Sequence, residues 1–222
     1  MNHSPLEAKV LFHIGVVPLT GTVITTWGLM ATMTVGSWLA TRGLRVVPGK
    51  WQAIIETLVV EVEEQITALL NRDARPFLPL LGTLFLFLVV ANLCGIIPGV
   101  KPPTASIETP AALAAIIFFS VHFFGVRVQG TVKYLKGYLR PNPVMLPFNI
   151  LSELTRSFSL AMRLFGNIMS EELVVAIVLA LAGLLVPIPF MAFGILVGLV
   201  QAYIFSVLAT VYIGGGIGAV GK

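Results

Sequence analysis

The sequence is poor in charged residues, which make up 11% of its 222 positions, whereas 57% of the residues are apolar. A soluble domain usually carries about 25% charged residues. A chain this apolar cannot cover a water-exposed surface with polar groups, so a soluble globular domain is excluded. The composition indicates a multi-pass integral membrane protein.

Reactive and metal-binding residues are also scarce. The single cysteine, Cys94, lies in an apolar run and cannot form an intramolecular disulfide. The three histidines have no ligand-like spacing, so we expect no metal site, and nothing indicates a cofactor. The chain has no glycine-rich phosphate loop ending in Lys-Ser or Lys-Thr and no recognisable nucleophile–base pair, so we expect no catalytic site. No basic region precedes the first apolar run, so no cleavable signal peptide is expected.

Basic residues gather in two connections between apolar segments. One connection contains Arg42, Arg45 and Lys50, and the other contains Arg127, Lys133, Lys136 and Arg140. The positive-inside rule places both connections in the cytoplasm, with the N-terminus outside and the C-terminus cytoplasmic. They could also bind acidic lipid headgroups. Because these residues flank apolar spans and form no aromatic-rich patch, nucleic-acid binding is not expected.

Three membrane spans are expected in the first two thirds of the chain, at residues 18–41, 77–98 and 110–126. The first is rich in threonine, whose hydroxyl groups can bond back to helix carbonyls and are therefore tolerated in lipid. Thr109 followed by Pro110 predicts the start of the third span, with the threonine as the capping residue.

Residues 50–72 differ from the spans, because apolar side chains recur there at helical spacing and glutamates occupy much of the remainder. This pattern predicts an amphipathic helix. It fits a helix lying along the cytoplasmic membrane interface and a helix facing a protein partner equally well.

The C-terminal third predicts a long helical hairpin. Residues 148–186 contain no proline, and a helix of that length would extend roughly 58 Å. The hydrocarbon core of a membrane is about 30 Å thick, so this helix must be strongly tilted or extend out of the bilayer. Pro187 and Pro189 then predict a turn, and residues 190–213 return as a second long helix. The predicted fold class is therefore all-α integral membrane, a single domain of five to six helices.

A polar stripe runs along the first helix of this hairpin. At 3.6 residues per turn, eight polar residues fall in one arc about 120° wide. They are Ser152, Glu153, Arg156, Ser159, Arg163, Asn167, Ser170 and Glu171. Placing a charged side chain at mid-membrane costs at least about 2.5 kcal/mol of free energy, so we expect Arg163 to have a compensating interaction. One interpretation is an internal ion pair of Arg163 with Glu108 or Glu171. The other is a water-filled groove or a polar partner along the whole stripe, and the length of the stripe favours this second interpretation.

Several motifs of the chain, taken together, resemble those of subunit a of the F-type ATP synthases. Residues 163–167 (Arg-Leu-Phe-Gly-Asn) resemble the signature of that family, and 151–156 fit the stretch before it. Residues 91–98, 103–106 and 201–205 resemble its earlier-span ending, its outer-loop motif and its final-helix motif, in the right order.

The resemblance implies roles for individual residues. Arg163 corresponds to the essential arginine, and Glu172, nearly opposite it on the helix, to the carboxylate of the extracytoplasmic half-channel. Asn92 and Gln201 would line polar cavities near that carboxylate, and Asn167 would lie near the arginine. Further candidates for the half-channels are Glu153, Arg156, Ser159, Ser170, Glu171 and Glu108.

Three positions depart from the family pattern. Gly194 stands where some members carry histidine, so a relay between that histidine and Glu172 is not available. Ser157 follows Arg156 where proline is common, which affects local bending. Glu108 stands where many members have asparagine; we prefer helix capping over a role in ion entry for this residue.

The resemblance implies a stator subunit that conducts H⁺ or Na⁺ through two offset half-channels to carboxylates of a rotating c-ring. The implied partners are the c-ring, the peripheral-stalk b subunits, the rest of the complex and the lipid of a bacterial plasma (inner) membrane. Two other readings stay open: a secondary transporter for an anionic solute with Arg163 as its clamp, and a purely structural membrane subunit.

Overall fold

The computed structural model describes residues 10–14, 17–43, 49–96, 102–138, 144–183 and 186–218, and most of them are helical. The helices are α1 (Gly21–Thr41), α2 (Lys50–Leu70), α3 (Leu78–Leu93), α4 (Glu108–Gln129), α5 (Thr131–Tyr138), α6 (Met145–Ala182) and α7 (Pro187–Gly216). By length and composition α1, α4, α6 and α7 can cross a membrane, and α3 is a shorter apolar helix. The chain is thus an all-α, multi-pass membrane protein, as the sequence predicts.

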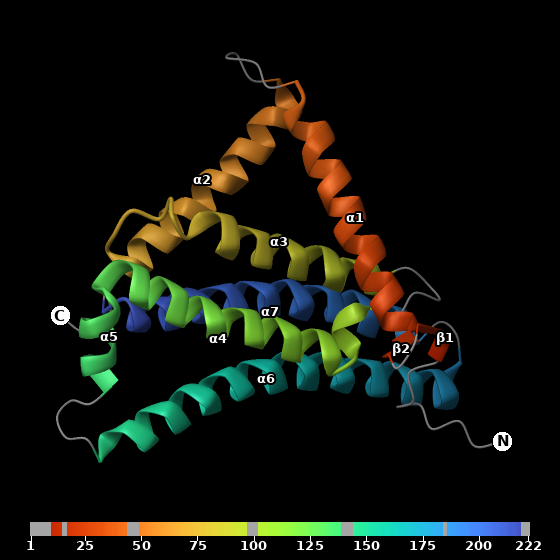
Figure 1. Ribbon diagram of the computed structural model, residues 1–222. Helices are drawn as coiled ribbons and strands as arrows, with labels where there is room; N and C mark the ends of the chain where they lie inside the picture. Colours follow the sequence, from red (N-terminus) through yellow and green to blue (C-terminus); the bar gives the residue numbers. More distant parts are fainter. Residues whose placement is uncertain are drawn as a thin grey trace.

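Four helices form a stack in which α3, α4, α6 and α7 run side by side, while α1 and α2 diverge from it as two sides of a triangle (Figure 1). Helix α7 packs against α2, α3, α4 and α6 and lies at the centre of the contacts. Its buried residues Ala202, Phe205, Ala209 and Ile213 recur every three or four positions, so one apolar face is held in the core. Most of the remaining apolar side chains of the outer helices are exposed, as lipid requires.

Helix α6 is unbroken over 38 residues, which corresponds to about 57 Å. It begins at Met145, three residues before the expected start, because Pro147 falls in the first turn, where a helix tolerates proline. Gly183, with φ +80°, ends the helix four residues before Pro187 begins α7. The polar stripe therefore lies on one continuous helix.

Threonine side chains in α1 bond back to the helix, as the sequence predicts. Thr26 Oγ1 donates to the Thr22 carbonyl at 2.7 Å, and Thr32 and Thr34 each donate to the carbonyl four residues earlier at 2.8 Å. Each hydroxyl is thereby satisfied within its own helix, which makes a threonine-rich span compatible with lipid.

The predicted start of the third span is wrong in detail. Helix α4 begins at Glu108 with Ile107 at the N-cap, and no side chain caps it. Thr109 is buried within the first turn. The first four N–H groups of a helix have no partner inside the helix, and the proline ring meets no helical carbonyl in the first turn, so Pro110 is also tolerated at the third position. Glu108 lies in the first turn, where a carboxylate interacts favourably with the helix dipole.

A strand hairpin and a short helix were not predicted. Strands β1 (Val10–Ile14) and β2 (Val17–Thr20) form an antiparallel hairpin before α1. Helix α5 lies in the basic segment 127–147, which we expected to be a connection; residues 139–143 of that segment fall outside the described chain. Gly130, with φ +83°, turns the chain between α4 and α5. Tyr134 of α5 packs directly on Gly125 of α4, where a Cβ would overlap the tyrosine ring.

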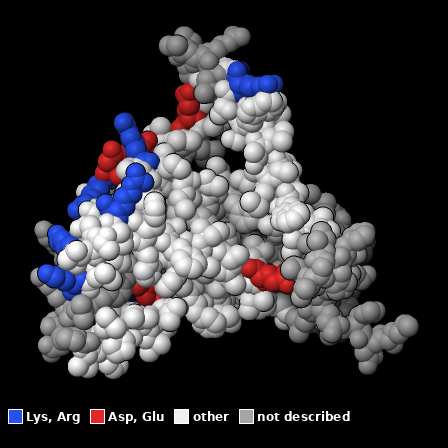
Figure 2. Space-filling model, in the orientation of Figure 1, with Lys and Arg blue, Asp and Glu red and all other residues white. Residues whose placement is uncertain are grey.

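Charged side chains gather at one end of the stack. On the face shown in Figure 2, Lys and Arg lie mainly over α5 and the neighbouring ends of α2 and α4. One further basic group lies where α1 approaches α2. The flanks of the stack between its two ends are mostly uncharged on this face, as expected for a surface in contact with lipid.

Candidate functional site

Arg163 lies near the middle of α6 and its side chain is exposed on the surface of the chain. It is the single charged residue between positions 157 and 170. Within the part of the chain that the structure describes, Arg163 makes no ion pair, so the pairings with Glu108 or Glu171 are absent there. An exposed cation at this depth calls for a partner supplied by another molecule.

The face of α6 that carries Arg163 is exposed along most of its length. Arg156, Ser159 and Ser170 are exposed on the same side of the helix. Beyond them the exposed side chains become apolar, with Val174, Ile177 and Leu181 at helical spacing. This side of α6 is therefore polar in its first half and apolar in its second, with the arginine between.

A hydrogen bond links the stripe to α7. Asn167 Nδ2 donates to Gln201 Oε1 at 2.6 Å, across 34 positions of sequence. Gln201 is 3% exposed, and its Nε2 is the one buried side-chain nitrogen without a hydrogen-bond partner among the described residues. Because buried amide donors are normally hydrogen-bonded, this nitrogen is available to an acceptor that lies outside the described chain.

Asn92, near the C-terminal end of α3, connects that helix to α7. Its Nδ2 donates to the carbonyl of Gly198 at 2.7 Å, and Thr104 Oγ1 donates to its Oδ1 at 3.2 Å. Asn92 therefore joins α3, α7 and the segment that contains Thr104. The absence of a side chain at Gly198 allows this close approach, because a Cβ there would lie 3.0 Å from the Cβ of Asn92.

The two adjacent glutamates of α6 are both partly buried. The carboxylate of Glu171 lies directly against Gly194 of α7, where a Cβ would overlap it. Glu172 follows about 100° further around the helix, so the two side chains leave α6 in different directions. The structure thus brings the Glu171 carboxylate to the α6–α7 interface.

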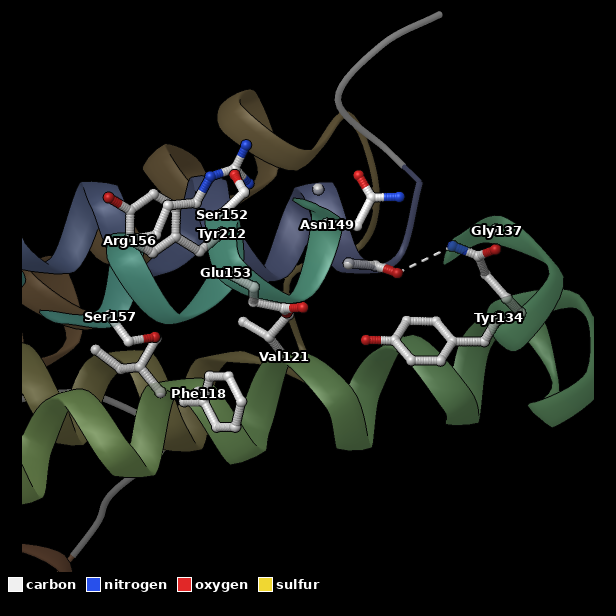
Figure 3. Close-up of a pocket in the computed structure, with 14 residues that line it drawn as sticks. Phe118, Val121, Tyr134, Gly137, Asn149, Ser152, Glu153, Arg156, Ser157 and Tyr212 are labelled. Carbon is white, nitrogen blue, oxygen red and sulfur yellow. Dashed lines mark hydrogen bonds between the residues drawn. The ribbon is translucent and has the colours of Figure 1, made fainter. Parts of the chain in front are cut away.

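A cavity of about 310 Å³ opens between the other ends of α4, α6 and α7 (Figure 3). Its lining includes Asn149, Ser152, Glu153, Arg156, Ser157 and Tyr212. Glu153 also approaches His122 Nε2 of α4, at 3.7 Å, and the guanidinium of Arg156 lies 5.9 Å from the ring of Tyr212. Three residues at the start of the polar stripe therefore line this cavity.

His122, Tyr212 and Thr104 belong to these polar clusters although their sequence pattern did not single them out as candidates. His122 Nδ1 donates to the Phe118 carbonyl at 2.8 Å, which leaves Nε2 directed to Glu153. A histidine within an apolar span was a signal that could have been used. Glu108 is exposed at the start of α4 and has no described contact with Arg163. No three His, Cys, Asp or Glu side chains in the described ranges could share a metal ion.

Comparisons with known proteins identify the family to which the chain is similar. The family model described as ATP synthase A chain matches residues 23–214. The chain is 59% identical to "ATP synthase subunit a 2" of Bradyrhizobium sp. (strain BTAi1) over 222 residues, covering 100% of both chains. It is 46% identical to "ATP synthase subunit a 2" of Pelobacter propionicus, over 94% of this chain and 92% of that protein. It is 48% identical to "ATP synthase subunit a 1" of Hahella chejuensis, over 95% of this chain and 89% of that protein.

Proposed function

The chain belongs to the ATP synthase A chain family, and on this premise we propose that it is the stationary subunit through which H⁺ or Na⁺ reaches and leaves a rotating c-ring. The observation that carries the proposal is Arg163, an exposed cation midway along a long apolar helix, without an acidic partner in the described chain. A ring of carboxylates moving past α6 would supply that partner.

Arg163 acts on each ring carboxylate as it passes. Arginine stays protonated in proteins, so its charge does not depend on the ion that is being carried. A fixed positive charge favours the ionised form of a nearby carboxylate and so releases the bound ion. The same charge repels cations and prevents them from leaking directly between the two half-channels.

The cavity around Glu153 and Arg156 forms the inner half-channel in this proposal. It opens at the end of the stack where the basic residues gather (Figure 2), the end that the positive-inside rule assigns to the cytoplasm. The C-terminus then lies in the cytoplasm, the N-terminus outside, and the membrane is a bacterial plasma (inner) membrane. The amphipathic α2 lies along the cytoplasmic interface.

The outer half-channel lies at the opposite end of α6 and α7. Glu171 and Glu172 supply carboxylates there, and the buried Nε2 of Gln201 supplies a donor to water or to a ring carboxylate. An ion enters by this path, loads a ring site, travels almost a full turn and leaves by the inner cavity. Each elementary charge that crosses 100 mV supplies about 2.3 kcal/mol, so several ions are needed for each ATP.

Nucleotide chemistry belongs to other subunits of the complex, and this chain also contacts the peripheral-stalk b subunits. A transporter for an anionic solute would use unwound helices at its substrate site. Helix α6 is continuous through Arg163, which supports the stator function over that alternative. Uptake of an organic anion by the isolated chain in vesicles would favour the transporter instead.

Cysteine labelling tests whether the inner cavity holds water. Cys94 is the sole cysteine, so Cys94→Ser gives a cysteine-free background. Ser157→Cys, in the cavity lining, should react with a membrane-impermeant maleimide added from the cytoplasmic side and be protected from the outer side. Phe158→Cys is the control, because its exposed side chain is not in the lining and should face lipid. Equal labelling of both positions would contradict a water-filled cavity.

Glu172→Gln tests the outer half-channel. Removing one of two neighbouring carboxylates should slow ion flux by about 10-fold, since a positioned group that takes up and gives off a proton contributes at least that much. The complex should assemble normally, because glutamine preserves the shape of the side chain. Flux of H⁺ or Na⁺ into vesicles that contain the purified complex is the measurement. Unchanged flux would remove Glu172 from the path.

A further inference from the structure

One face of α7 presents three consecutive contacts to its neighbours. Gly194, Gly198 and Gln201 follow at the i, i+4, i+7 spacing of one helical face. The Gly198 carbonyl accepts from Asn92, and the Gln201 side chain accepts from Asn167. Gly194 is buried, and the group lying against it is the Glu171 carboxylate.

The contact at Gly194 depends on the missing side chain. A Cβ built there would overlap Glu171 Oε1 and would lie 2.9 Å from its Oε2. The atoms that meet it belong to the end of a flexible side chain, so a larger residue would move the carboxylate and leave the backbone in place. Glycine inside a helix is less favourable than alanine, and this contact gives a structural reason for glycine at this position.

The position of Glu171 on α6 continues the line of the functional stripe. Arg163, Asn167 and Glu171 follow at intervals of four residues, which keeps them on neighbouring parts of one face. Asn167 reaches Gln201 and Glu171 reaches Gly194, so the same pair of helices holds both groups. Glu172 leaves the helix about 100° away and cannot occupy the same place.

We propose that Glu171, seated against Gly194, loads the cation from the outer half-channel, and that Gly194 is the residue that positions it. This inference rests on the proposed function. The carboxylate binds a cation that enters from outside and becomes neutral; it passes the cation to an ionised ring carboxylate and returns to its anionic form. The carboxylate at this position of α7 is thus supplied by Glu171 of α6, in the space left by the missing side chain of Gly194.

The test is a set of variants of the whole complex, purified and reconstituted in vesicles. Gly194→Ala should lower ion uptake by about 10-fold, because displacing a reactive group by about 1 Å can cost that much or more. It should also raise the outer cation concentration that gives half-maximal uptake. Glu171→Asp with Gly194→Ala should recover most of the loss, because the shorter side chain makes room for the added methyl group. Gly82→Ala is the matched control: this helical glycine has open space around it, and uptake should not change.

Three outcomes are decisive. Recovery in the double variant, with the shift in half-maximal concentration reversed, supports a carboxylate positioned by Gly194. Wild-type uptake in Gly194→Ala, or losses that simply add in the double variant, would overturn the inference, because residues in contact do not act independently. If the wild-type complex carries neither H⁺ nor Na⁺, the proposed function itself fails. That result is seen in the wild type, so it is distinct from a failure of the Glu171–Gly194 inference, which is seen only in the variants.

Discussion

Replacing Arg163 by alanine is expected to abolish ATP synthesis driven by an ion gradient, while the complex still assembles. The side chain is exposed and makes no described ion pair within the chain, so its removal leaves no buried charge unpaired and no packing defect. In the proposed function, the variant loses the fixed charge that releases ions from the ring. Removing one preorganised electrostatic group typically costs about 10²–10³ in rate, and we expect a loss of at least that size.

The measurement is ATP synthesis by the purified complex in vesicles under an imposed H⁺ or Na⁺ gradient. Arg163→Lys is the informative control, because it keeps a positive charge but not the planar guanidinium. Lysine can lose its proton when buried against other groups, whereas arginine cannot, so lysine should restore little activity. Met162→Leu, beside Arg163 on the exposed surface, should behave as the wild type. Full coupled synthesis by Arg163→Ala would refute the assignment.

Replacing Gln201 by leucine should separate function from stability. The Gln201 Nε2 group is buried, and its donor meets no acceptor within the described chain. Leucine is apolar and of similar size, and it removes this donor together with the acceptor that Asn167 uses, so resistance of the complex to unfolding by detergent should change little. Asn167 loses an acceptor in this variant, but it is exposed and can bond to water.

Ion-driven ATP synthesis should fall in the same variant. A hydrogen bond to a charged group contributes about 1.5–3 kcal/mol, which corresponds to roughly a 10- to 100-fold loss in rate. Val200→Leu, on the exposed side of α7, is the control and should change neither property. If Gln201→Leu instead weakens the complex and leaves synthesis intact, the amide is structural and its donor does not serve the ion path.

Much of the architecture could be predicted from the sequence, because the features that specify it are local. An apolar run of sufficient length predicts a span, and glutamates alternating with apolar residues at helical spacing predict α2. The absence of proline between residues 148 and 186 predicts the unbroken α6. The stripe that contains Arg163 follows from helical geometry, and its identification from residues 163–167.

Helix ends and short elements were less predictable, because several local signals compete there. Thr109 and Pro110 form a good capping pair, but the helix begins two residues earlier than they predict and buries the threonine. Helix α5 packs through Tyr134 on Gly125 of a different helix, a contact that no local sequence pattern contains.

The sequence by itself determined the membrane class, the long helical hairpin and the polar face that carries Arg163. Tertiary structure alone decided which groups meet: Asn167 with Gln201, Asn92 with Gly198, His122 with Glu153 and Glu171 with Gly194. The physical reason is that helical periodicity fixes the direction in which a side chain leaves its own helix. The partner it meets depends on how far neighbouring helices slide and rotate as they pack, and that is set by the whole core.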